Sequence, residues 1–112
     1  MMNNEIKKNL AEAVRIANSL FARCKTSGTN ISFRCGDSVW ISRSGSCFET
    51  LAPEDFVEVG LDGTILSDGK PSKELPLHLA LYASNPTTRA VIHTHAPYST
   101  LWSFPAIRPI LR

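Results

Sequence analysis

Apolar positions recur along the chain at spacings that predict helices and strands. In residues 4–23 they fall every three or four residues, which is typical of one face of an amphipathic helix. Asn3 or Asn4 suits the cap before this helix, and Glu5 suits the positive end of its dipole. The apolar stripe consists of Ile6, Leu10, Val14, Ala17 and Phe21. We therefore expect a surface helix that packs against the core through one face.

Shorter apolar runs in the middle of the chain predict strands. Gly36-Asp37 and Asp62-Gly63 are pairs typical of tight hairpin turns, and each is flanked by two such runs. Pro53-Glu54-Asp55 predicts a short turn or helical piece between the two hairpins. The predicted strands are residues 31–35, 39–41, 57–61 and 64–66.

A second helix is predicted to begin at Ser72 or Lys73 and to end at Asn85-Pro86. Its stripe consists of Leu75, His78, Leu79 and Tyr82. Residues 89–95 then predict a strand, and a last helix runs from residue 97 or 98 to 102. This order predicts one α+β domain over residues 1–112, with a mostly antiparallel sheet and helices packed on it.

Composition excludes several classes of function. Twelve Lys and Arg oppose ten Asp and Glu, and this net charge of +2 is dispersed, so we expect no nucleic-acid partner. No apolar stretch is long enough to cross a membrane, and the polar first residues do not resemble a signal peptide, so we expect a cytoplasmic protein without a membrane partner. Cys24, Cys35 and Cys47 form no CxxC motif and are expected to be reduced thiols.

The most informative segment is residues 90–95, where His93 and His95 end an apolar strand. Alternate side chains of a strand point to the same face, so both imidazoles can meet one ion. Such a pair is a plausible beginning of a zinc site, although packing explains an isolated pair equally well. Ile92 and Thr94 are expected on the other face.

Glu74 lies at the start of the second predicted helix, whose following strand carries the histidine pair. It is a candidate acid/base beside the metal, or simply a favourable charge at a helix start. His78 lies one turn later on the same face. It could orient Glu74, replace a metal ligand, or pack beneath the sheet.

Three loops are rich in hydroxyls, amides and glycine, which together can bind phosphate. They cover residues 26–30, 44–46 and 71–73. Taken singly, each is also an ordinary loop composition.

Read together, these motifs resemble the class II aldolase/adducin family from about Ile6 to Trp102. The matching runs are TSGTNISFR (26–34), ISRSG (41–45), LAPEDF (51–56), LDG (61–63), KPSKELPLHLALY (70–82) and AVIHTH (90–95). The resemblance implies a three-layer α/β/α domain and a homotetramer with active sites between subunits. It also implies a metal-dependent lyase of carbohydrate metabolism that acts on a phosphorylated sugar or sugar acid.

The resemblance assigns roles to individual positions. His93 and His95 would bind a divalent metal, usually zinc, and Glu74 would be the catalytic acid/base. The phosphate or substrate would be bound by Asn30, Ser44, Gly45, Ser72 and Lys73. KPSKE and GSC are most similar to the 3-oxo-tetronate 4-phosphate decarboxylases, whereas fuculose-phosphate-type aldolases more often have serine at the position of Lys73. An aldolase or an epimerase of the family remains an alternative.

The sequence departs from the family pattern at two places. Thr29-Asn30 replaces the usual Gly-Asn pair in the phosphate loop. The family fold continues past residue 112, and its third ligand histidine lies there, whereas no histidine follows His95. A truncated or non-catalytic, adducin-like fragment is therefore a further alternative.

Overall fold

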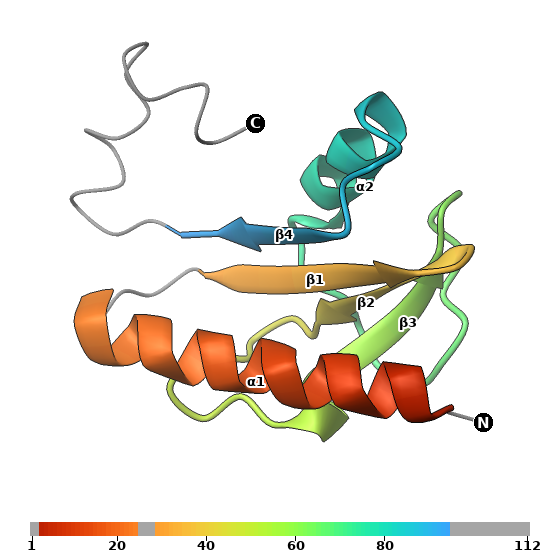
Figure 1. Ribbon diagram of the computed structural model, residues 1–112. Coiled ribbons are helices and arrows are strands. Elements are labelled where there is room, and N and C mark those ends of the chain that lie inside the picture. The colour runs from red at the N-terminus through yellow and green to blue at the C-terminus, as the bar shows by residue number, and fades with distance from the viewer. Residues whose placement is uncertain (1–2, 25–28, 95–112) are drawn as a thin grey trace, which may run out of the picture.

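A four-stranded antiparallel sheet with the order β3-β2-β1-β4 forms the centre of the fold. The computed structural model describes residues 3–24 and 29–94. Its elements are α1 (Asn4–Cys24), β1 (Asn30–Cys35), β2 (Ser38–Ser42), the 3-10 helix η1 (Pro53–Asp55), β3 (Phe56–Gly60), α2 (Leu75–Ser84) and β4 (Ala90–His93). Figure 1 shows α1 along one face of the sheet and α2 beyond the other. The described chain therefore has the predicted α/β/α layers.

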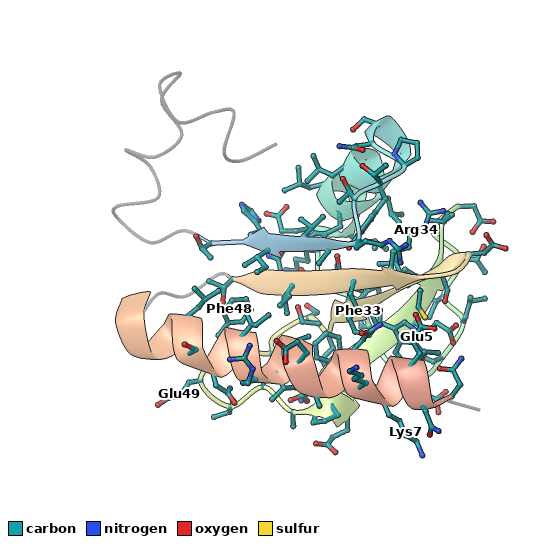
Figure 2. All side chains as sticks on the ribbon, in the orientation of Figure 1. Glu5, Lys7, Phe33, Arg34, Phe48 and Glu49 are labelled. Carbon is teal, nitrogen blue, oxygen red and sulfur yellow. The ribbon has the colours of Figure 1, made fainter. Side chains whose placement is uncertain are left out.

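Helix α1 begins as its sequence predicts. The backbone N–H of Ile6 donates a hydrogen bond of 2.8 Å to Oδ1 of Asn3, which satisfies one of the free N–H groups of the first turn. Leu10 and Ala17 are buried against the sheet, whereas Lys7 points away from it (Figure 2). The helix is thus held by one apolar face.

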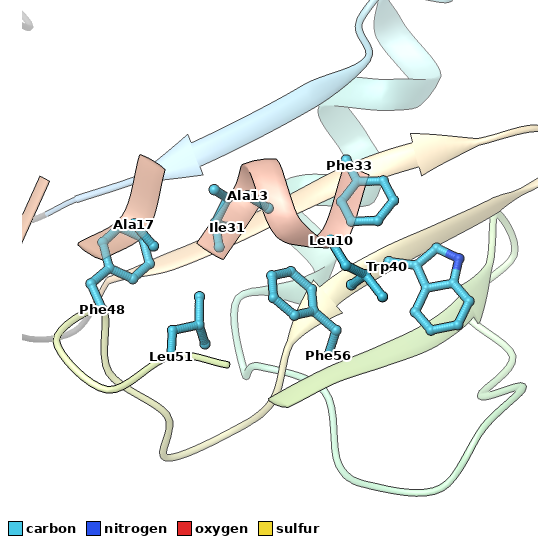
Figure 3. Packing of buried hydrophobic residues seen from close by; sticks show 9 residues of the cluster. All are labelled: Leu10, Ala13, Ala17, Ile31, Phe33, Trp40, Phe48, Leu51 and Phe56. Carbon is cyan, nitrogen blue, oxygen red and sulfur yellow. The ribbon is translucent and has the colours of Figure 1, made fainter. Parts of the chain in front are cut away.

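The larger core lies between α1 and the sheet (Figure 3). Phe33 of β1 and Phe56 of β3 pack in it with ring centroids 6.0 Å apart. Phe48 and Leu51, from the connection after β2, close the core beside the helix. The buried members of this cluster are Leu10, Ala13, Ala17, Ile31, Phe33, Trp40, Phe48, Leu51 and Phe56.

The opposite face of the sheet packs against α2. Because strand side chains alternate between faces, Val39, Val57 and Val59 point away from α1 and form a second buried cluster with Tyr82. Val91 of β4 packs against the same cluster. Residues of β1 and β4 that face α2 are therefore in position to build a site.

One predicted strand is missing and one helix begins later than predicted, whereas the other described strands match to within one or two residues. Residues 64–66 form no strand, and Ile65 makes only a single bridge to Val59. Ile65 and Leu66 are about half exposed, so no layer covers this arm and burial does not favour extending the ladder. Helix α2 begins at Leu75 instead of Ser72 or Lys73, because residues 72–75 form a turn closed by the Leu75 N–H and the Ser72 carbonyl at 3.0 Å.

Other predictions fall outside the described residues. His95 and the helix predicted from residue 97 or 98 to 102 both lie there. In the part of the chain that the structure describes, no helix is long and apolar enough to cross a membrane.

Candidate functional site

Three strand ends meet at one end of the sheet. His93, the last residue of β4, pairs with Asn30, the first residue of β1. The backbone N–H of Ile31 donates to Oγ of Ser42, the last residue of β2, at 3.1 Å. Because neighbouring strands are antiparallel, the C-terminal ends of β2 and β4 flank the N-terminal end of β1. Sequence positions more than 60 residues apart thus come together.

The loop that leaves β2 makes a tight turn at this end. Both the backbone N–H and the hydroxyl of Ser46 donate to the carbonyl of Arg43, at 3.1 and 2.7 Å. Gly45 has φ +83, a left-handed conformation that favours glycine. No atom lies within 4 Å of the position that a Cβ would take there. Arg43 also forms a 2.9 Å ion pair with Asp55 of η1. The turn is therefore anchored at its base, and its tip is free of packing.

The segment before α2 is pinned to this loop. The N–H of Ser44 donates to the Lys70 carbonyl at 2.8 Å, and the N–H of Ser72 donates to the Ser42 carbonyl at 3.0 Å. An isolated bridge joins Arg43 and Pro71 between these bonds. Two of the predicted phosphate-binding positions, Ser44 and Ser72, are thereby held on adjacent segments.

Glu74 is the N-cap residue of α2. The sequence had predicted it within the first turn of this helix, one position further along. Its backbone N–H is bound by Oγ of Ser72 at 3.2 Å. Its half-buried carboxylate makes no cap bond and no ion pair with the residues that the structure describes. Lys73 beside it is exposed. Glu74 is thus fixed through its backbone, and its acidic group is not engaged in a structural interaction there.

His93 is half-buried and lies on the α2 face of the sheet, the face that Val91 also occupies. Ile92 lies on the opposite face, as predicted from strand alternation. Within residues 3–24 and 29–94 no group of three or more His, Cys, Asp or Glu could hold a metal ion. The structure therefore positions one of the two predicted imidazole ligands, and His95 lies outside the described residues.

His78 makes hydrogen bonds that the sequence analysis did not predict. Its side chain is fully buried, and both ring nitrogens are engaged, Nε2 with Oδ1 of Asn30 and Nδ1 with Oγ of Ser32 at 2.6 Å. Ser32 Oγ also lies 2.7 Å from the Tyr82 hydroxyl. Burial, and secondarily the nearby His93, lower the pKa of His78 to about 4. Of the three alternatives, His78 packs beneath the sheet and its ring does not bind Glu74.

A signal for this arrangement was present in the sequence. Asn30 and Ser32 alternate on β1, so they share one face, and His78 and Tyr82 are one turn apart on α2. Two polar side chains on each of two facing elements predict a hydrogen-bonded pairing. What the sequence did not show was that β1 packs beneath α2 at this height.

Thr29 is a second polar group that sequence reasoning did not single out as a site residue. Its side chain is buried, and its Oγ1 has no hydrogen-bond partner in the described structure. A buried hydroxyl without a partner is costly in most proteins. This threonine lies directly before Asn30 in the sequence.

Comparison with known proteins places the chain in a family. The model of the class II aldolase and adducin N-terminal domain matches residues 8–112. The chain belongs to this family.

Among its relatives, the chain is 42% identical over 95 residues to a 3-oxo-tetronate 4-phosphate decarboxylase of Escherichia coli, a match that covers 82% of this chain and 45% of that protein. It is 36% identical over 97 residues to an L-fuculose phosphate aldolase of Methanococcus maripaludis, over 85% of this chain and 53% of the other. The chain thus spans about half the length of the relatives it matches.

Solved structures agree on the fold. The crystal structure of YgbL from Escherichia coli, described as an aldolase, epimerase or decarboxylase, superposes with a TM-score of 0.81 at 37% identity. That match covers 89% of this chain and 50% of YgbL. An L-fuculose 1-phosphate aldolase gives a TM-score of 0.78 at 24% identity, which shows the shared fold alone.

Proposed function

We propose that the chain carries the phosphate- and metal-binding half of a lyase that breaks a carbon–carbon bond in a phosphorylated sugar acid. The reaction best supported is decarboxylation of 3-oxo-tetronate 4-phosphate. The observation that carries the proposal is the convergence of Asn30, Ser44, Ser72, Glu74 and His93 at one end of the sheet. The similarity to a 3-oxo-tetronate 4-phosphate decarboxylase supports the choice of substrate.

The phosphate would bind where the two pinned segments meet. Ser44 and Ser72 offer hydroxyls, Gly45 offers a backbone N–H group, and Asn30 adds an amide. The open space at Gly45 lets an anion approach the backbone closely. Binding the phosphate at a distance from the reacting carbons positions those carbons in the site.

The bond that breaks joins the carboxylate carbon to C2 of the substrate. Carbon dioxide leaves, and the electron pair remains on C2 and is shared with the C3 ketone as an enediolate. Glu74, whose carboxyl group is unengaged among the described residues, would deliver a proton to C2. The product is dihydroxyacetone phosphate. Exposed Lys73 would pair with the substrate carboxylate or with the phosphate.

A divalent metal such as zinc would be held by His93 and His95, and it supplies a Lewis acid for negative charge on the substrate oxygens. The donor chemistry fits, because imidazole is a common zinc ligand and His93 is half-buried at the converging strand ends. Burial strengthens the attraction between such a charge and its ligands.

An aldolase is the second candidate, favoured by the similarity to L-fuculose phosphate aldolases. The two reactions share the enediolate and differ in the fragment that leaves. Aldol cleavage releases an aldehyde and no carbon dioxide. The identity of the products therefore separates them.

The test incubates the zinc-loaded chain with 3-oxo-tetronate 4-phosphate and measures carbon dioxide and dihydroxyacetone phosphate. We expect both in equal amounts, and we expect Glu74→Gln to lower the rate by about 100-fold or more, because an acid/base group contributes that much. Glu54→Gln, an exposed glutamate of η1, is the matched control and should keep the wild-type rate. Equal rates for wild type and Glu74→Gln would contradict the assigned role. No carbon dioxide from this substrate, together with release of an aldehyde from L-fuculose phosphate, would replace the decarboxylase with the aldolase.

A further inference from the structure

Four buried polar groups form a continuous chain from α2 to the converging strand ends. It runs from the Tyr82 hydroxyl to Ser32 Oγ at 2.7 Å, on to His78 Nδ1 at 2.6 Å, and from His78 Nε2 to Oδ1 of Asn30. Each of these side chains is at least 96% buried, with Asn30 the most exposed at 4%. Asn30 is the only member that stands at a predicted phosphate-binding position.

The chemistry of the groups gives the chain a direction. A carboxamide oxygen has no proton, so His78 must donate to Asn30 from Nε2. A neutral imidazole then has an unprotonated Nδ1, which accepts the Ser32 hydroxyl proton. Ser32 Oγ is then left to accept from the Tyr82 hydroxyl. Every link has one donor and one acceptor.

This direction decides which group Asn30 presents to a ligand. Since the carboxamide oxygen is bound to His78, the NH2 group is the part that remains for other partners. The neighbouring residue Ile31 is bonded to Ser42, where the Ser44 loop begins, so Asn30 lies on β1 next to the strand end from which the predicted phosphate loop leaves. An NH2 group attracts an anion there, whereas a carbonyl oxygen would repel it.

We propose that His78 is a positioning residue, which Ser32 and Tyr82 hold as the Nε2–H tautomer so that it fixes Asn30 with its NH2 group toward the substrate phosphate. The assignment of the ligand rests on the proposed function, whereas the orientation of Asn30 rests on the hydrogen bonds alone. An apolar side chain would fill the position of His78 without burying polar groups, so packing alone does not account for the chain of bonds.

The first measurement is the nitrogen spectrum of the His78 ring in the 112-residue chain labelled with 15N. We expect a protonated Nε2 and an unprotonated, hydrogen-bonded Nδ1. Protonated Nδ1 would mean that the hydrogen bonds from Tyr82 to Asn30 run in the opposite direction. Asn30 would then present its carbonyl oxygen, which overturns the proposal. This readout does not depend on phosphate binding.

The second measurement is the Kd of inorganic phosphate, from chemical-shift titration. Ser32→Ala removes the donor to Nδ1 without touching Asn30 or His78, and we expect it to weaken binding about tenfold, as loss of one oriented hydrogen bond does. In the Asn30→Ala background, Ser32→Ala should have no further effect, because it acts only through Asn30. Val39→Ala, a cavity in the same α2-facing core, is the control that lowers stability without weakening phosphate binding.

The outcomes separate this proposal from the proposed function. An unchanged Kd in Ser32→Ala, or equal losses in both backgrounds, would overturn the positioning role. If Ser32→Ala does not fold, Tyr82→Phe, which keeps the serine, is expected to weaken phosphate binding in the same direction. A wild-type chain with protonated Nε2 but no affinity for phosphate would contradict the proposed function and leave the orientation of Asn30 intact.

Discussion

Asn30 is the residue at which the sheet, helix α2 and the predicted phosphate site meet. Its backbone pairs with His93, and its side chain accepts from His78. No carboxylate is hydrogen-bonded to His78 among the described residues; the polar groups near its ring belong to Asn30, Ser32, Tyr82 and His93. Burial without a counter-charge therefore keeps its imidazole neutral.

This neutral histidine predicts a pH-dependent stability. The pKa of His78 is lowered from 6.5 to about 4, so between these values the unfolded chain binds a proton that the folded chain does not. The contribution of His78 to the free energy of unfolding is complete above pH 6.5 and is lost as the pH falls toward 4. From about pH 7 to about pH 5 we expect the free energy of unfolding to fall by about 2 kcal/mol on this account.

Denaturant unfolding at the two pH values checks this prediction. A His78→Asn chain lacks the titrating group and should show a smaller difference between the two pH values. A difference of the same size in both chains would assign the pH dependence to other groups.

At the scale of elements, the sequence predicted what local patterns determine. Helix α1 follows its apolar stripe and its Asn3 cap, and the first hairpin turns at Gly36-Asp37 as expected. The strand predicted for residues 64–66 was wrong. Its sequence pattern suits a strand, but no layer of the fold covers these residues. Tertiary packing decides whether such a segment forms a strand, and a local sequence pattern carries no information about that packing.

Strand β4 ends the described sheet beside β1, and its outer edge has no partner strand among the described residues. Ile92 on the α1 face is 43% exposed and lines a groove with Ile16 and Ile31. An open edge with apolar side chains favours association with another chain. We therefore expect the 112-residue chain to self-associate through this edge.

Light scattering after size-exclusion chromatography tests this expectation. Ile92→Lys places a charge on the edge and should shift the chain toward monomer. Ile65→Lys is the matched control, since Ile65 is similarly exposed at 51% but lies outside the sheet. A wild-type chain that remains a monomer at all concentrations, or an equal effect of both variants, would contradict the role of the edge.

At the scale of the whole molecule, the proposed function depends on which strand ends and loops the topology brings together. The sequence identified His93, Glu74, Asn30 and the serine loops as candidates, but their proximity follows from the β1–β4 register and the bonds between residues 42–44 and 70–72. Such long-range pairings leave no local pattern in the sequence. Only the family resemblance indicated that these residues form one site. The tetramer, the metal and all of its ligands, His93 included, remain predictions.

The most direct test of the account is zinc affinity of the wild-type chain beside His93→Ala and Thr94→Ala. Thr94 is next in the chain and, by strand alternation, would face away from the predicted site, so it is the matched control. We predict that wild type and Thr94→Ala bind zinc alike, and that His93→Ala loses more than the about 10- to 100-fold that follows from loss of a supporting hydrogen bond. Zinc bound equally by all three chains, or by none, would contradict a metal site at this end of the sheet.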